Sequence, residues 1–92
     1  MGGVIYVGDV GTEIRLDIGQ EGATNASIEW MKPGGITGSW PAIVHGTEVT
    51  YRVEEGDLDV PGAYRLQAKA ELHGGWRGLG ETAVIHISPR FK

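Results

Sequence analysis

Three histidines are the side chains of this chain best suited to bind a metal ion or to move a proton: His45, His73 and His86. No two of them stand at i, i+2 or i, i+4, and the chain has no cysteine that could complete a set of metal ligands. A solvated side chain is therefore expected at each histidine position. The sequence predicts no metal site and no cofactor.

The sequence also gives no clear sign of a nucleophilic serine or of a catalytic pair of carboxylates. Catalysis by a serine needs a base and a group that orients the base, and Ser27, Ser39 and Ser88 lie in no G-x-S-x-G turn. The carboxylates that a glycosidase-like pair would need alternate with apolar residues, as on the solvated face of a strand. They are Glu13, Asp17, Glu48 and Asp57. The sequence predicts no catalytic residue, and we expect a protein that is not an enzyme.

The elements that would position any site are strands. Between Gly56 and Ile87 the pattern predicts one long β-hairpin, entered through a tight corner and turned at Gly74-Gly75. Apolar and polar residues alternate along its first strand, and a side-chain period of two means one buried face and one solvated face. The residues expected to face inward are Leu66, Ala68, Ala70 and Leu72.

The rest of the chain reads as shorter strands. We expect them at 4–7, 12–18, 26–32, 40–44 and 48–53, with a polar loop over 19–25. About seven strands at spacings near ten residues are typical of an immunoglobulin-like antiparallel β-sandwich. The sequence therefore predicts an all-β protein with a single domain over residues 1–92. Because the chain has no cysteine, packing alone must hold this fold together.

The corner before the hairpin is predicted to be structural. Leu58, Pro61 and Gly62 lead into Tyr64, and in such sandwiches a tyrosine at this place bonds its hydroxyl back to the backbone a few residues upstream. The alternation of the strands also predicts a core, which the corner would close. The expected core residues are Ile14, Leu16, Ile28, Trp30, Tyr51, Leu66, Ala68 and Ile85.

The tryptophans have different expected roles. Trp30 falls on the inward face of its strand and is interpreted as a core anchor, whereas Trp40, before a proline, is expected at a strand start and partly exposed. Trp76 and Arg77 follow the glycine turn of the hairpin. An aromatic residue beside an arginine is favoured at protein interfaces, so this pair is a candidate partner contact. The alternative is that Trp76 covers the open end of the core.

The composition narrows the classes of partner. The net charge is -4, with 12 acidic and 8 basic residues, which disfavours binding to nucleic acid. No apolar run approaches the roughly 20 residues that a membrane helix needs, so membrane insertion is not expected. The N-terminus lacks the features of a secretory signal, and the absence of cysteine suits a reducing compartment.

The chain also resembles a known family. The stretches that carry the resemblance are 6–14, Lys32-Pro33, 56–59, 64–68, 75–78 and 80–82. Together they are similar to small immunoglobulin-like β-sandwich domains encoded by bacteriophages and prophages, in particular the N-terminal domain of baseplate upper proteins. The resemblance implies a non-enzymatic structural module of a phage tail or baseplate. It implies assembly in the host bacterial cytoplasm, then a place in the virion tail.

The same resemblance implies a role in protein–protein contacts. The partners would be other phage structural proteins or a second copy of the chain, reached through an exposed strand edge or the Trp76 tip. An alternative function is a carbohydrate-binding or adhesion module that recognises a bacterial surface. In that alternative, Trp40 or Trp76 would be the platform on which a sugar stacks.

Overall fold

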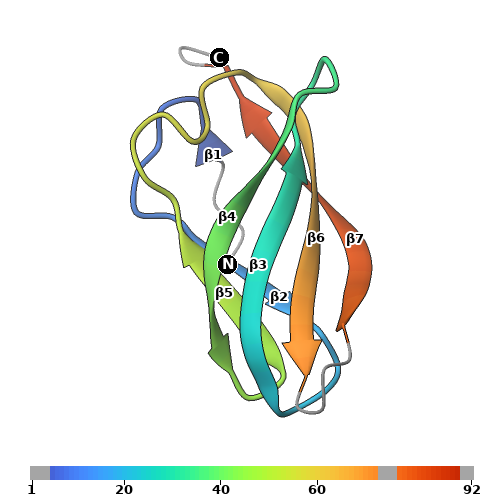
Figure 1. Ribbon diagram of the computed structural model, residues 1–92. Coiled ribbons are helices and arrows are strands. Elements are labelled where there is room, and N and C mark those ends of the chain that lie inside the picture. The colour runs from blue at the N-terminus through green and yellow to red at the C-terminus, as the bar shows by residue number, and fades with distance from the viewer. Residues whose placement is uncertain (1–4, 73–76, 90–92) are drawn as a thin grey trace.

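The computed structural model describes residues 5–72 and 77–89, which form strands and no helix (Figure 1). Within these residues there is accordingly no helix long and apolar enough to cross a membrane. The seven strands are β1 (Ile5–Tyr6), β2 (Glu13–Asp17), β3 (Ala23–Met31), β4 (Thr37–His45), β5 (Glu48–Arg52), β6 (Gly62–Leu72) and β7 (Arg77–Ser88). The prediction of an all-β protein is confirmed.

The strands form one continuous sheet that folds over on itself. Their order is β1-β7-β6-β3-β4-β5-β2, and all neighbours are antiparallel except β1 and β7. The first part of β4 (37–42) pairs with β3, and its last part (43–45) pairs with β5. We call β1, β7, β6, β3 and the first part of β4 the front layer. The last part of β4, with β5 and β2, is the back layer, which lies behind β3 and β6 in Figure 1.

The core lies between these layers, and alternation decides which side chains enter it. In the front layer Ile28 pairs with Trp40 on one side and with Ala68 on the other, and all of them are buried. Leu66, Ala68 and Ala70 of β6 are buried as the period of two predicts. The sandwich expected from the sequence is therefore the observed fold.

The expected core residues divide into two groups. Ile14, Ile28, Leu66 and Ala68 are buried, and the remaining members are partly buried against the same cluster. Those partly buried members are Leu16, Trp30, Tyr51 and Ile85. The cluster also contains buried residues that the expected set left out: Trp40, Val49, Val53, Leu58, Tyr64 and Ile87.

The exposure predicted for Trp40 is wrong. The strand begins at Thr37 and continues through Pro41, so Trp40 lies within β4 and not at its start. Its ring stacks on that of Tyr51 with centroids 4.8 Å apart, and only 4% of the residue is exposed. The prediction took Pro41 as a sign that Trp40 lies at the start of a strand. Pro41 instead lies within β4, where it pairs with Ser27 of β3.

Two strand boundaries also differ from expectation. β3 begins at Ala23, inside the segment expected to be a loop, with an irregular register between Ala23 and Asn25. β1 is limited to Ile5–Tyr6 among the described residues. The expected turn at Gly74-Gly75 lies outside the described residues.

The corner before β6 is closed by a side chain. The Tyr64 hydroxyl donates to the Val60 carbonyl oxygen at 2.7 Å and accepts from the Val60 N–H at 3.2 Å. Leu58 and Tyr64 are both buried, whereas Pro61 is exposed. Gly62 has a φ of 123°, a conformation that favours glycine. One tyrosine thus satisfies both backbone groups of a residue in the connection between β5 and β6.

Candidate functional site

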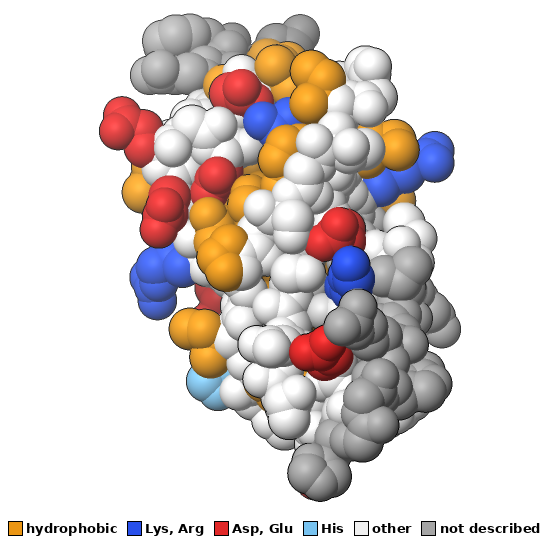
Figure 2. Space-filling model, viewed as in Figure 1, with side chains coloured by type: hydrophobic (Ala, Val, Ile, Leu, Met, Phe, Trp, Pro, Cys, Tyr) orange, Lys and Arg blue, Asp and Glu red, His pale blue; other side chains and the backbone are white. Residues whose placement is uncertain are grey.

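The candidate site is a groove on the outer face of the front layer, the face that points away from the core. It has a volume of about 820 Å³ and is lined from β3, β4, β6 and β7. Figure 2 shows acidic and basic side chains close together over β3 and β6, and apolar side chains gathered toward the end of β3. The groove exists because alternation sends polar side chains of four neighbouring strands to the same face.

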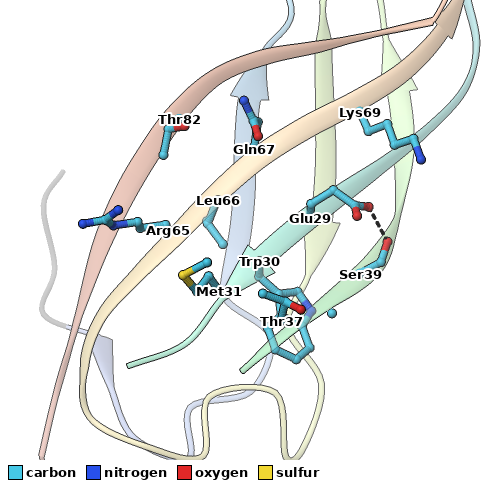
Figure 3. Close-up of a pocket in the computed structure, with 11 residues that line it drawn as sticks. Glu29, Trp30, Met31, Thr37, Ser39, Arg65, Leu66, Gln67, Lys69 and Thr82 are labelled. Carbon is cyan, nitrogen blue, oxygen red and sulfur yellow. Dashed lines mark hydrogen bonds between the residues drawn. The ribbon is translucent and has the colours of Figure 1, made fainter. Parts of the chain in front are cut away.

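A row of polar side chains crosses the middle of the groove. Strand register places Ser39 beside Glu29, Glu29 beside Gln67, and Gln67 beside Thr82. The Ser39 hydroxyl donates to Glu29 Oε2 at 2.8 Å, as Figure 3 shows, and the Ser27 hydroxyl donates to the same oxygen at 3.1 Å. Two hydroxyl donors therefore hold the Glu29 carboxylate in place. Its other oxygen has no hydrogen bond from a described residue.

Gln67 is also held in place. Its side-chain amide donates to the Gly80 carbonyl oxygen at 2.8 Å, so its amide nitrogen is tied across to β7. The amide oxygen has no hydrogen bond from a described residue. The centre of the row therefore offers acceptor groups whose positions are fixed by the sheet.

Two cations flank this row. Arg65 and Lys69 stand on β6 two residues to either side of Gln67, and both are exposed (Figure 3). The ion pairs of the described residues use Arg15 and Lys32, and no described carboxylate lies within 4.0 Å of Arg65 or Lys69. The groove thus combines one fixed carboxylate with two cations that have no anionic partner among the described residues.

Apolar side chains border the groove on one side. Register places Arg65 between Met31 of β3 and Val84 of β7. Met31 is 41% exposed and Val84 is 50% exposed. Both lie on the outer face beside the guanidinium-bearing residue, so the stem of Arg65 runs along an apolar strip.

Trp30 lines the groove near the β3–β4 hairpin, although its ring lies on the core side of the sheet and packs against the core cluster. Register places it opposite Gly38, and a Cβ on that glycine would overlap the Trp30 ring. The absence of a side chain at Gly38 therefore makes room for the indole. The indole Nε1 is buried with no hydrogen-bond partner among the described residues. Trp30 lies beside Trp40, with ring centroids 6.0 Å apart.

A partly buried cation, Lys32, lies against the Trp30 ring. Lys32 Nζ lies 4.8 Å from the Trp30 ring centroid and 2.6 Å from Asp59 Oδ1. The Lys32 side chain is only 11% exposed, whereas that of Asp59 is 55% exposed. The hydrogen bond from Lys32 lowers the pKa of the Asp59 carboxyl, although partial burial of this carboxyl opposes the shift. The pair links β3 to the corner before β6.

Tyr51 stacks on Trp40, which in turn lies beside Trp30. Its hydroxyl donates to Asp57 Oδ2 at 2.6 Å, and the same oxygen accepts from the Glu54 N–H at 2.7 Å. Burial raises the pKa of Tyr51, and the hydrogen bond to Asp57 adds to the effect. Tyr51 therefore keeps its proton, and this cluster is structural, since it lies behind Trp40 and not in the groove.

The residues singled out for catalysis or metal binding do not assemble into a site. His45 and His86 are exposed and their side chains make no hydrogen bond to a described residue, and His73 lies outside the described residues. In the described ranges no group of three or more His, Cys, Asp or Glu side chains could hold a metal ion. Ser27 and Ser39 both donate to a carboxylate and contact no histidine there.

The predicted partner contact of Trp76 and Arg77 stays a prediction. Trp76 lies outside the described residues. The backbone of Arg77 belongs to β7 and pairs with Glu71, but its side chain is not described.

Sequence reasoning missed the groove entirely. The alternation along 65–71 put Gln67 and Lys69 on the solvated face of their strand, which is correct, but this face was treated as empty of function, and Glu29 was not singled out. The signal that could have found them is the set of odd-numbered polar residues at 27–29, 37–39 and 65–69. Pairing these runs in register would have put them side by side.

Comparison with known proteins supports the fold and no more. No protein-family model matches the chain, and no curated protein matches it. The crystal structure of CopC from Methylosinus trichosporium OB3b is similar, with a TM-score of 0.65 and 16% sequence identity. The match covers 99% of this chain and 89% of CopC. Over nearly its whole length, therefore, this chain shares the β-sandwich of that protein.

The expected relation to phage tail proteins is wrong. The matching structure is CopC, which is not a tail or baseplate protein, and no family model supports the resemblance. The function in a tail and the location in host cytoplasm and virion are wrong with it. The motifs behind the resemblance are turns and strand ends, which sandwiches of unrelated function share because they specify a fold and not a role.

The alternative of a carbohydrate-binding or adhesion module is not retained either. It needed an exposed aromatic platform, and Trp40, one of its two platforms, is buried and stacked on Tyr51. The other platform, Trp76, lies outside the described residues.

Proposed function

We propose that this chain is a non-enzymatic binding module that holds an extended, acidic polypeptide segment in the groove on the outer face. The observation that carries the proposal is the pair of cations, Arg65 and Lys69, that line the groove without an anionic partner among the described residues. In a protein of net charge -4, Arg65 and Lys69 give this groove a local excess of positive charge over its one lining carboxylate, Glu29. They suit acidic side chains of a partner.

The shape of the site favours an elongated ligand. A second hollow of about 330 Å³ adjoins the groove at Lys69 and continues along β3 and β6 past Asn25, Ser27 and the carboxylate of Glu71. The two hollows are open to solvent along the strands. A peptide in extended conformation fits such a trough, because its side chains project at regular intervals toward the sheet.

The polar row would set the order of side chains along the ligand. Arg65 can hold a carboxylate through two parallel hydrogen bonds, and Lys69 acts as a point charge. Between them, Glu29 and the amide oxygen of Gln67 accept hydrogen bonds, so they favour a donor and repel an acid. Met31 beside Arg65 would contact an apolar side chain. The preferred segment is therefore acid, hydrogen-bond donor, acid, with an apolar neighbour at the Arg65 end.

Two observations support a role without catalysis. Ser27 and Ser39, the serines nearest the groove, both donate their protons to the Glu29 carboxylate. Of the described histidines, neither His45 nor His86 lines the groove, so neither is placed to act as a base there. A binding role requires only contacts from these side chains and no chemical reaction at any of them.

The test is binding of a capped peptide of about ten residues in which glutamates are spaced by serine and valine. We expect NMR shift changes at Ser39, Gln67 and Thr82, and an affinity that falls as salt is added. The double variant Arg65→Ala/Lys69→Ala should weaken binding at least about tenfold, which corresponds to about 1.4 kcal/mol.

Arg52→Ala is the matched control, because Arg52 is an exposed arginine on β5, outside the groove. It should leave the affinity unchanged. The same peptide with lysine in place of glutamate should not bind. Equal losses in the control and in the double variant, or equal binding of the lysine peptide, would contradict the proposal.

A further inference from the structure

We propose that Met31 is an oxidation site, and that its conversion to the sulfoxide by a peroxide lowers the affinity of the groove for an acidic ligand by engaging Arg65. The effect on ligand binding rests on the proposed function of the groove. The oxidation and the new contact with Arg65 do not, because both concern side chains of the free protein.

Met31 is open to a small oxidant. It is the last residue of β3, it lines the groove on the outer face, and 41% of it is exposed. The ease with which a thioether is oxidised follows its exposure. The second methionine of the chain, Met1, lies outside the described residues. Met31 is therefore the single methionine of the described residues, and it stands in the candidate site.

The reaction balances with hydrogen peroxide as the one co-reactant. The Met31 sulfur forms a bond to one peroxide oxygen while the O–O bond breaks, so the sulfur is oxidised by two electrons and the peroxide is reduced. The proton of the transferred oxygen passes to the departing hydroxide, which leaves as water. The product is a polar sulfoxide, which methionine sulfoxide reductases can return to the thioether.

Arg65 is the donor best placed to bind the new oxygen. Strand register puts Arg65 directly opposite Met31, so their Cβ atoms stand about 4.5–5.5 Å apart on the same face. Figure 3 shows the Met31 thioether turned toward the stem of Arg65. No described carboxylate lies within 4.0 Å of the Arg65 guanidinium. Its N–H groups can therefore turn to the sulfoxide oxygen, which accepts hydrogen bonds.

The sulfoxide changes the Arg65 end of the groove in two ways. Its oxygen takes up guanidinium donors that would otherwise hold a ligand carboxylate through two parallel hydrogen bonds. Its polarity also interrupts the apolar strip that Met31 and Val84 form along the Arg65 stem. Lys69 stands four residues further along β6, about 13 Å away, and is out of reach. Oxidation therefore weakens one of the two cationic contacts and leaves the other unchanged.

The first measurement needs no ligand. After treatment with hydrogen peroxide, tandem mass spectrometry should find one added oxygen at Met31, formed at a rate within about tenfold of that of free N-acetylmethionine amide. The NMR resonance of the Arg65 Nε–H should shift on oxidation. It should stay in place in treated Met31→Leu, which controls for oxidation at other residues. No added oxygen at Met31, or an Arg65 resonance that does not move, would overturn the proposal.

The second measurement compares the affinity for the glutamate peptide before and after peroxide. The affinity should fall at least about threefold for the unmodified chain and by the same factor for Lys69→Ala. It should not change for Met31→Leu, and it should fall less for Arg65→Ala, which has no guanidinium to engage. A fall in Met31→Leu, or an equal fall in Arg65→Ala, would contradict the proposal.

The two measurements separate this proposal from the function of the groove. If the peptide does not bind to the untreated chain, the proposed function is wrong. The Arg65 resonance still decides whether the oxidised Met31 engages the guanidinium.

Discussion

At the scale of single residues, what sequence reveals depends on how far apart two partners stand in the chain. Tyr64 and Val60 are four residues apart, and the proline and glycine between them fix the corner, so their contact could be anticipated. Lys32 and Asp59 are 27 residues apart. Nothing in either residue or its neighbours indicates the other, because only the folded sheet brings them together. Long-range pairs of this kind were therefore beyond prediction.

The Lys32–Asp59 pair should make stability depend on pH in acid. Its hydrogen bond lowers the pKa of Asp59 in the folded chain, so the unfolded chain takes up this proton at a higher pH than the folded chain does. The stabilisation is then complete above the ordinary carboxyl pKa of about 3.9 and is lost as the pH falls through the lower folded value. Asp59→Asn should cost about 1 kcal/mol at neutral pH, since the carboxylate is more than half exposed.

Urea unfolding from neutral pH into acid checks this expectation. The difference in unfolding free energy between the unmodified chain and Asp59→Asn should shrink as the pH falls. Glu21→Gln is the control, because Glu21 is exposed and makes no hydrogen bond with the described residues. A difference that stays constant across the acid range would speak against the role given to the pair.

At the scale of elements, alternation predicted which face of each strand is buried, and register was the missing step. The inward positions of β6 follow from a period of two, and Leu66, Ala68 and Ala70 are buried as expected. The environment of Trp40 depends on where β4 begins and on which residues of β3 it faces. Local sequence does not contain that information, because register is set by pairing between strands. The same reason hid the groove, which exists only once four strands are aligned.

The pairing of Trp30 with Gly38 gives a prediction at this scale. Gly38→Ala should destabilise the fold by about 1–3 kcal/mol, because the added Cβ overlaps the indole ring and a packed sheet leaves it little room to move. Chemical denaturation followed by tryptophan fluorescence measures the loss. Gly80→Ala is the control, since a Cβ there would meet its nearest atom at an ordinary 3.8 Å. Equal midpoints for the two variants would rule out the proposed clash.

At the scale of the whole molecule, composition and strand spacing were enough to predict the β-sandwich fold, but they were not enough to predict a function. The motifs that suggested a viral protein are turn signatures, and these constrain the backbone and leave the exposed faces free to vary. The exposed faces distinguish this chain: two cations without described partners on the groove, charges along β2, and none along residues 82–88 of β7.

The charges on β2 should therefore control how the molecule associates. Glu13→Thr/Arg15→Thr removes one charge of each sign from that edge without changing the net charge, and should produce associated species larger than those of the unmodified chain, because the β2 edge can then pair. Light scattering measures their size. Glu21→Thr/Lys69→Thr removes one charge of each sign at exposed positions that do not lie on β2 or on its neighbour β5, and should leave the size unchanged. An edge variant that scatters like the unmodified chain would show that other features keep β2 from pairing.

The first part of β4 belongs to the front layer and its last part to the back layer, so one continuous strand connects the two layers. Ser39, which donates to the groove carboxylate, and His45, which pairs with Glu48, therefore lie toward opposite ends of the same strand. If one layer unfolded before the other, β4 would have to break its pairing with either β3 or β5. We therefore expect the two layers to unfold together. A ligand bound at Ser39 should therefore also raise the protection of the back-layer amides against hydrogen exchange, although it would not contact that layer.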